Sequence, residues 1–68
     1  MSYKVDIKKL KSLRIERGLT QEQVGQHIGL TKQGVGALER GIAIHRLPRL
    51  VKLAELYGLK VHDILIAA

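Results

Sequence analysis

The sequence of 68 residues lacks cysteine, phenylalanine and tryptophan, and it contains a single proline. The absence of cysteine excludes the disulfide bonds on which many small secreted domains depend. The N-terminus also lacks the charged segment and apolar run of a signal peptide. We therefore expect a cytoplasmic protein.

Aromatic residues are nearly absent, since Tyr3 and Tyr57 are the only two. The core must therefore be aliphatic, and the chain lacks the stacking surfaces that bind single-stranded nucleic acids and many RNAs. Long apolar runs are missing too, whereas a membrane-spanning helix needs about 20 apolar residues. We expect no membrane span, and we expect duplex DNA rather than single strands as a nucleic-acid partner.

Acidic residues are half as frequent as basic ones: six Asp and Glu stand against twelve Lys and Arg, a net charge of +6. On so small a chain this charge attracts phosphate polyanions. Charge alone does not identify a nucleic-acid-binding protein, because many basic proteins bind nothing acidic specifically. Evidence for nucleic-acid binding must therefore come from a sequence motif.

The segment from Thr20 to Gly41 predicts two short helices joined by a glycine turn. Thr20 can cap the first helix, with Gln23 three residues later completing a capping box, and Thr31 can cap the second. Gly29 supplies the turn between them. The apolar faces of the two helices comprise Val24, Gly25, Ile28, Val35 and Leu38. This layout predicts a helix-turn-helix over residues 20–40.

Three further helices are expected around this unit. Asp6 caps the first helix of the chain and Gly18 ends it, Pro48 stands in the first turn of the fourth and Gly58 ends it, and the last begins near Val61. No strand alternation is visible. The prediction is one compact, all-α, five-helix domain over residues 1–68, with the helix-turn-helix at helices two and three.

Several motifs agree in spacing with one known family. They are LRIERGLTQ (Leu13 to Gln21), the turn residue Gly29, LERG (Leu38 to Gly41) and a Leu-x-x-Leu-Ala helix (Leu50 to Ala54). From about Leu10 to Leu65 the chain resembles the phage repressor and Cro type of helix-turn-helix domain, the XRE-type family. The resemblance implies a lambda-repressor-like fold whose second motif helix enters the major groove of DNA.

The start of that second helix is the main candidate for base reading. The resemblance implies that Thr31, Lys32 and Gln33 point into the major groove. Lysine can donate to guanine and glutamine can pair with adenine, although Lys32 could equally contact a phosphate. Gly36 and Ala37 lie one turn further along, where small side chains let the helix sit deeper, let Ala37 touch a thymine methyl, or reduce the number of bases read.

Other residues are candidates for backbone contacts or for support. By resemblance Gln21 touches a phosphate and braces the recognition helix, or is simply a solvated polar residue. Arg40, Arg46 and Arg49 are candidate phosphate contacts or solvated charges. Arg14 and Glu39 resemble a structural ion pair that joins the first helix to the end of the recognition helix.

Two glycines weaken the recognition helix. Gly34 and Gly36 each cost about 1 kcal/mol relative to alanine inside a helix. The helix must therefore be held by packing, and we expect Val35 and Leu38 to be strongly buried. Alanine at Gly34 or Gly36 should raise the stability.

Some branched aliphatic residues do not fit the apolar stripes of their segments. We assign Ile42, Ile44 and Ile66 to a homodimer interface, with loop packing as the alternative for Ile42 and Ile44. A twofold dimer would present two recognition helices to half-sites about 34 Å apart on a palindromic operator.

The sequence shows no residue pattern typical of a catalytic or metal site. The histidines His27, His45 and His62 fall on separate segments, so we expect no metal site, no cofactor and no small-molecule ligand. No catalytic Ser, His and acid set is present.

The expected function is a Cro-like or repressor-like, sequence-specific regulator that binds double-stranded DNA. The alternatives are a protein-interaction role on the same fold, such as an antitoxin or co-regulator, and the N-terminal fragment of a longer repressor.

Overall fold

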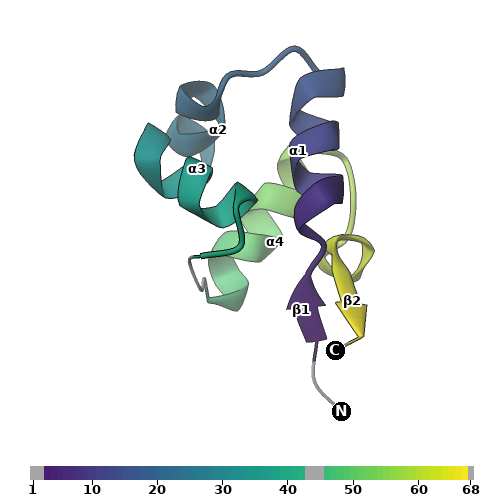
Figure 1. Ribbon diagram of the computed structural model, residues 1–68. Helices are drawn as coiled ribbons and strands as arrows, with labels where there is room; N and C mark the ends of the chain where they lie inside the picture. The colour runs from purple at the N-terminus through teal and green to yellow at the C-terminus, as the bar shows by residue number, and fades with distance from the viewer. Residues whose placement is uncertain (1–2, 43–45, 68) are drawn as a thin grey trace.

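The computed structural model describes residues 3–42 and 46–67. The elements in chain order are β1 (Tyr3–Val5), α1 (Ile7–Glu16), α2 (Gln21–Ile28), α3 (Lys32–Glu39), α4 (Leu47–Leu56), the 3-10 helix η1 (Val61–Ile64) and β2 (Leu65–Ala67). The helices gather into one body, and the two strands lie side by side at one end of it, close to both termini (Figure 1). None of the helices described is long and apolar enough to span a membrane.

The first three helices begin where the sequence predicts. Asp6 accepts a hydrogen bond from the amide of Lys9, at 3.3 Å, ahead of α1. Thr20 and Gln23 form both hydrogen bonds of the capping box, so two free amides at the start of α2 find acceptors. These cap predictions are confirmed.

The end of the chain differs from the prediction. The expected fifth helix is a four-residue 3-10 helix, and the expected absence of strands is wrong, because Leu65–Ala67 pairs antiparallel with Tyr3–Val5. The amide of Asp6 extends this pairing by donating to the carbonyl of Ile64 at 2.8 Å. The strands satisfy backbone groups of a segment too short for a stable helix. Their partner is remote in sequence, so no local pattern shows it.

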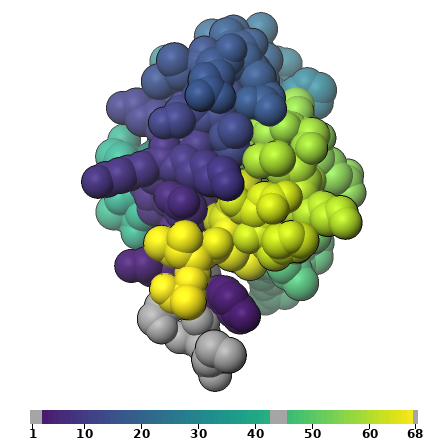
Figure 2. Space-filling model, turned by 90° about the vertical axis from the view of Figure 1, so that its right-hand side faces the viewer, coloured from purple at the N-terminus to yellow at the C-terminus, as the bar shows by residue number. Residues whose placement is uncertain are grey.

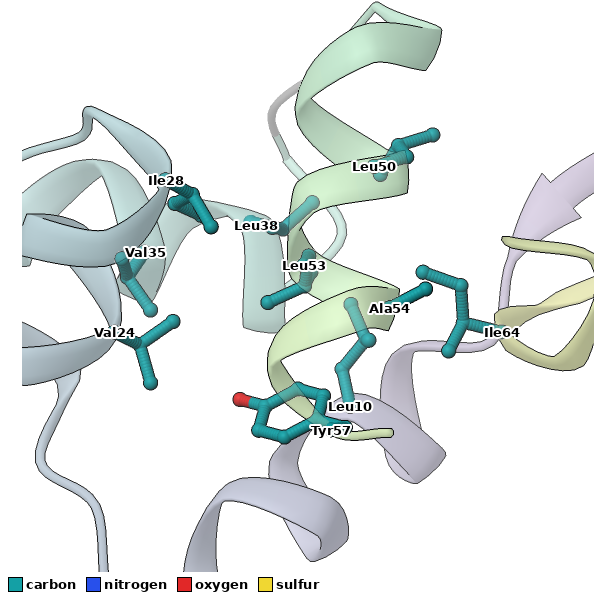
Figure 3. Close-up of a cluster of buried hydrophobic side chains, with 10 residues drawn as sticks. All are labelled: Leu10, Val24, Ile28, Val35, Leu38, Leu50, Leu53, Ala54, Tyr57 and Ile64. Carbon is teal, nitrogen blue, oxygen red and sulfur yellow. The ribbon is translucent and has the colours of Figure 1, made fainter. Parts of the chain in front are cut away.

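The core is aliphatic except for Tyr57. It consists of Leu10, Val24, Ile28, Val35, Leu38, Leu50, Leu53, Ala54, Tyr57 and Ile64. In Figure 3, α4 runs through the middle of this cluster, with side chains of α2 and α3 on one side and those of α1 and η1 on the other. Val35 and Leu38 are 1% and 2% exposed, which confirms the expected strong burial of these two residues of α3.

The first and last parts of the chain cover one face together. Figure 2 shows the purple N-terminal segments against the yellow and green C-terminal ones. Arg17 contributes to this join, because its guanidinium donates to the carbonyl of Tyr57 at 2.7 Å and lies 5.3 Å from the centre of the Tyr57 ring. Burial raises the pKa of the Tyr57 hydroxyl to about 12, and the negative charge of Glu39 acts in the same direction.

Candidate nucleic-acid interface

Two glycines shape the turn between α2 and α3. Gly29 has a φ of 76°, a left-handed conformation that ends α2, and the amides of Gly29 and Leu30 both donate to the carbonyl of Gly25. A Cβ atom at Gly25 would collide with the carbonyl oxygen of Leu30. The close approach of α2 to the turn therefore requires glycine at position 25, whereas the sequence showed only a small buried residue there.

The leading end of α3 lies at the surface. Thr31, Lys32 and Gln33 are all exposed. The hydroxyl of Thr31 is engaged as the helix cap, since it accepts from the amide of Gly34 at 3.1 Å. The side chains of Lys32 and Gln33 thus stand at an accessible helix start, where the free amides also attract anions.

The next turn of α3 is less accessible. Gly36 is buried and Ala37 is half-buried. A Cβ atom at Gly36 would lie 3.5 Å from a guanidinium nitrogen of Arg40 and 3.5 Å from the amide oxygen of Gln21. Gly36 therefore lies beneath two polar side chains, and the base contacts assigned to Gly36 and Ala37 stay predictions.

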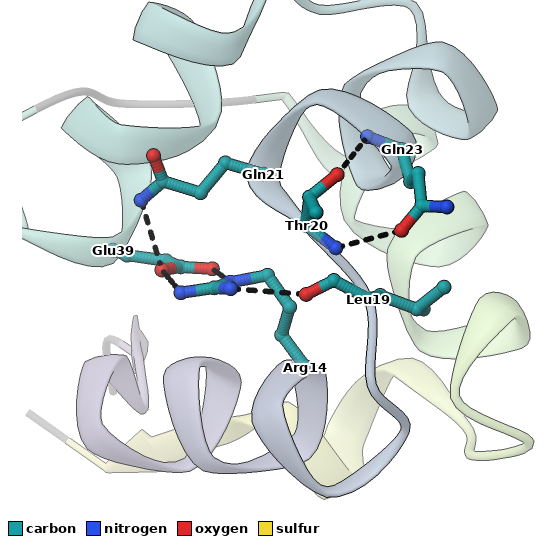
Figure 4. A network of polar contacts seen from close by, with 6 residues as sticks. All are labelled: Arg14, Leu19, Thr20, Gln21, Gln23 and Glu39. Atoms are coloured by element: carbon teal, nitrogen blue, oxygen red, sulfur yellow. Dashed lines mark hydrogen bonds and ion pairs between the residues drawn. The ribbon is translucent and has the colours of Figure 1, made fainter.

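The trailing end of α3 is fixed by a polar network. Glu39 forms a two-point ion pair with Arg14, at 2.7 and 3.1 Å, and Arg14 also donates to the carbonyl of Leu19 at 3.0 Å. Gln21 donates to the same carboxylate at 3.3 Å (Figure 4). The pair is largely buried, with side chains 13% and 5% exposed. The hydrogen bond to Glu39 raises the pKa of Arg14, which favours the charged form of its guanidinium.

The three arginines that are candidate phosphate contacts differ in exposure and in hydrogen bonding. Arg40 and Arg46 are exposed. Arg49 is half-buried and turns toward α2, where its Nε donates to the carbonyl of Ile28 at 3.1 Å and a terminal nitrogen donates to that of Gly29 at 3.4 Å. Sequence reasoning missed this arrangement, because the two carbonyls lie about twenty residues before the arginine.

The residues assigned to a dimer interface are exposed where the structure describes them. Ile42 is 71% exposed and Ile66 is 41% exposed, while Ile44 lies outside the described residues. Tyr3, Ile15 and Leu47 are also exposed apolar residues. Within residues 3–42 and 46–67 no group of His, Asp and Glu side chains could hold a metal ion.

Comparisons with known proteins identify relatives of this chain. A helix-turn-helix family model matches residues 10–64. The chain is 34% identical over 56 residues to the uncharacterized HTH-type transcriptional regulator YgzD of Bacillus subtilis, covering 82% of this chain and 85% of YgzD. It is 36% identical over 58 residues to the uncharacterized HTH-type transcriptional regulator MJ0272 of Methanocaldococcus jannaschii, covering 85% and 88%.

A phage protein and a solved structure are also similar. The chain is 38% identical over 56 residues to the cryptic phage CTXphi transcriptional repressor RstR of Vibrio cholerae, covering 82% of this chain and half of RstR. The crystal structure of apo-HppE matches with a TM-score of 0.78 at 20% identity, over 90% of this chain and 36% of that one. This last likeness concerns the fold alone. From the motifs, the geometry and the relatives together, the chain belongs to the XRE-type helix-turn-helix family.

Proposed function

We propose that the protein is a sequence-specific, double-stranded DNA-binding regulator of transcription that inserts α3 into the major groove. One observation carries the proposal: the leading end of α3 is exposed and polar, while the rest of the helix is held firmly in the body. A helix that reads bases must expose its N-terminal residues and be held rigidly by packing along the rest of its length. The regulator and repressor names of the relatives, and the net charge of +6, support the same function.

The base-reading chemistry resides in Lys32 and Gln33. The amine of Lys32 can donate to guanine O6 and N7 or hold a phosphate, and the amide of Gln33 can pair with adenine N6 and N7. A good pair with a base edge discriminates by roughly 1–3 kcal/mol. Thr31 stands beside them, with its oxygen already engaged as the cap.

The backbone contacts come from residues around the recognition helix. Arg40 follows α3 directly and Arg46 stands at the start of α4, and both are exposed. Gln21, in the first turn of α2, keeps its amide oxygen and one amide proton beyond the hydrogen bond to Glu39. These groups position the protein on the duplex without reading its sequence.

The functional unit that we propose is a homodimer on a palindromic operator. Ile42 and Ile66 expose large aliphatic side chains that a second copy would cover, and Ile44 belongs to the same proposal. Twofold symmetry then places the two recognition helices about one turn of DNA, ~34 Å, apart.

Selection of bound duplexes from a random pool tests this function. The expected result is enrichment of two inverted half-sites whose centres are about one helical turn apart. Recovery of single half-sites would contradict the dimer, while a pool without any enriched sequence at low salt would contradict the function itself and favour a protein-interaction role. The variant Lys8→Ala removes an exposed charge from α1, leaves the leading end of α3 intact and should select the same sequence.

A further inference from the structure

Arg49 connects α4 to the turn of the helix-turn-helix. It lies in the first turn of α4, and its guanidinium spans the carbonyls of Ile28 and Gly29, at 3.1 and 3.4 Å. Within residues 3–42 and 46–67 these are the only side-chain hydrogen bonds between α4 and the helix-turn-helix. The contact is thus a single polar link between the body and the turn.

The two carbonyls have no backbone donor within residues 3–42 and 46–67. Carbonyls at the C-terminal end of a helix lack intrahelical partners and carry partial negative charge. The amides of Gly29 and Leu30 both donate to the carbonyl of Gly25. The carbonyl of Ile28 instead accepts from Arg49. A guanidinium donates in two directions from one rigid plane, whereas the amine of lysine is a point charge on a flexible stem.

The turn determines the direction of α3. Only Leu30 and the cap residue Thr31 stand between Gly29 and the first residue of the helix. We propose that Arg49 is a positioning residue for DNA recognition: it holds this turn so that the leading end of α3 meets the groove at a fixed angle, and it is not a phosphate contact. The inference rests on the proposed function.

Binding measurements with two duplexes distinguish these roles. The probes are a duplex enriched by the parent chain from a random pool and a scrambled duplex of the same length, each titrated at several salt concentrations. Arg49→Lys keeps the charge but loses the fork, so affinity for the enriched duplex should fall roughly tenfold, as for loss of a charge-assisted hydrogen bond. Affinity for the scrambled duplex and the salt dependence should not change. Lys52→Ala, an exposed charge on the same helix, should retain the parent's preference between the two duplexes.

A phosphate contact predicts the opposite pattern. Arg49→Lys would then bind both duplexes like the parent. Arg49→Ala would weaken both equally and lower the slope of log affinity against log salt by about 0.9. That pattern would overturn the proposal.

Amide hydrogen exchange without DNA separates this inference from the proposed function. In Arg49→Lys the amide of Leu30 should exchange roughly tenfold faster because the turn opens more often, while that of Leu53 in the core of α4 should not change. If the parent binds no duplex, the proposed function fails but exchange still shows whether Arg49 holds the turn. If exchange at Leu30 is unchanged, the positioning role is wrong whatever the DNA measurements show.

Discussion

The two ends of α3 lie in opposite environments. At the leading end Lys32 and Gln33 are exposed, whereas at the trailing end Leu38 is buried and Glu39 is paired with Arg14. A helix of eight residues with two internal glycines is weak by itself. This helix therefore obtains its rigidity from its trailing end, and its accessible side chains lie at its leading end. Changes at the two ends should therefore have separate effects on stability and on binding.

Breaking the trailing end should have the largest effect on stability. Glu39→Ala leaves the guanidinium of Arg14 buried without its carboxylate, so the free energy of unfolding should fall by about 3 kcal/mol. Urea denaturation measures the loss. Glu55→Ala removes an exposed carboxylate from α4 and should change stability by less than about 0.5 kcal/mol. Equal effects of the two variants would show that the pair does not fix the helix.

The close approach of α2 to the turn is the next point to break. In Gly25→Ala the added methyl group meets the carbonyl of Leu30, and the backbone has to shift. We expect a loss of about 2 kcal/mol, in the range found for overpacked sites. A thermal melt that matches the parent would mean that α2 and the turn are not in tight contact.

A substitution at Gly36 should have an effect of opposite sign. In Gly36→Ala the added Cβ would lie 3.5 Å from Arg40 and Gln21, which is ordinary contact, so the gain in helix propensity should stabilise by about 0.5–1 kcal/mol. At Gly34 the Cβ would lie 3.3 Å from the side chain of Leu30, and the gain should be smaller. The melting temperatures of the two variants give the order. A lower melting temperature for Gly36→Ala would contradict the space observed around it.

The effect of Tyr57 is the smallest at neutral pH, because it appears only in alkaline solution. Burial raises the pKa of Tyr57 from 10.0 to about 12, so the folded state retains this proton when the unfolded state has lost it. The stabilisation is complete below pH 10 and declines as the pH rises from about 10 to 12. Tyr57→Phe should remove this part of the decline in denaturation series at rising pH. Tyr3→Phe, at an exposed site, should decline as the parent does.

The helix starts could be predicted because their signals are local. Thr20 and Gln23 stand three residues apart and form a capping box. Asp6 likewise caps α1 through the amide of Lys9, three residues further on. The helical spacing of apolar residues likewise placed Val35 and Leu38 in the core. Signals within one or two helical turns were thus sufficient for α1, α2 and α3.

The features that escaped prediction join remote parts of the chain. The sheet pairs Tyr3–Val5 with Leu65–Ala67, and neither segment shows by itself that the other is its partner. The hydrogen bonds from Arg49 to the carbonyls of Ile28 and Gly29 were not predicted, because nothing near Arg49 in sequence indicates the end of α2. The exposure of Lys32 and Gln33 agrees with the site predicted from the motif, but their contacts with bases stay a prediction.

Repeating the duplex selection with Gln33→Ala measures whether the leading end of α3 reads base edges while the trailing end only holds the helix. The variant should melt like the parent but lose its preference at one base position in each half-site, at a cost of roughly 1–3 kcal/mol for the parent's site. An unchanged preference in a fully folded variant would contradict the account.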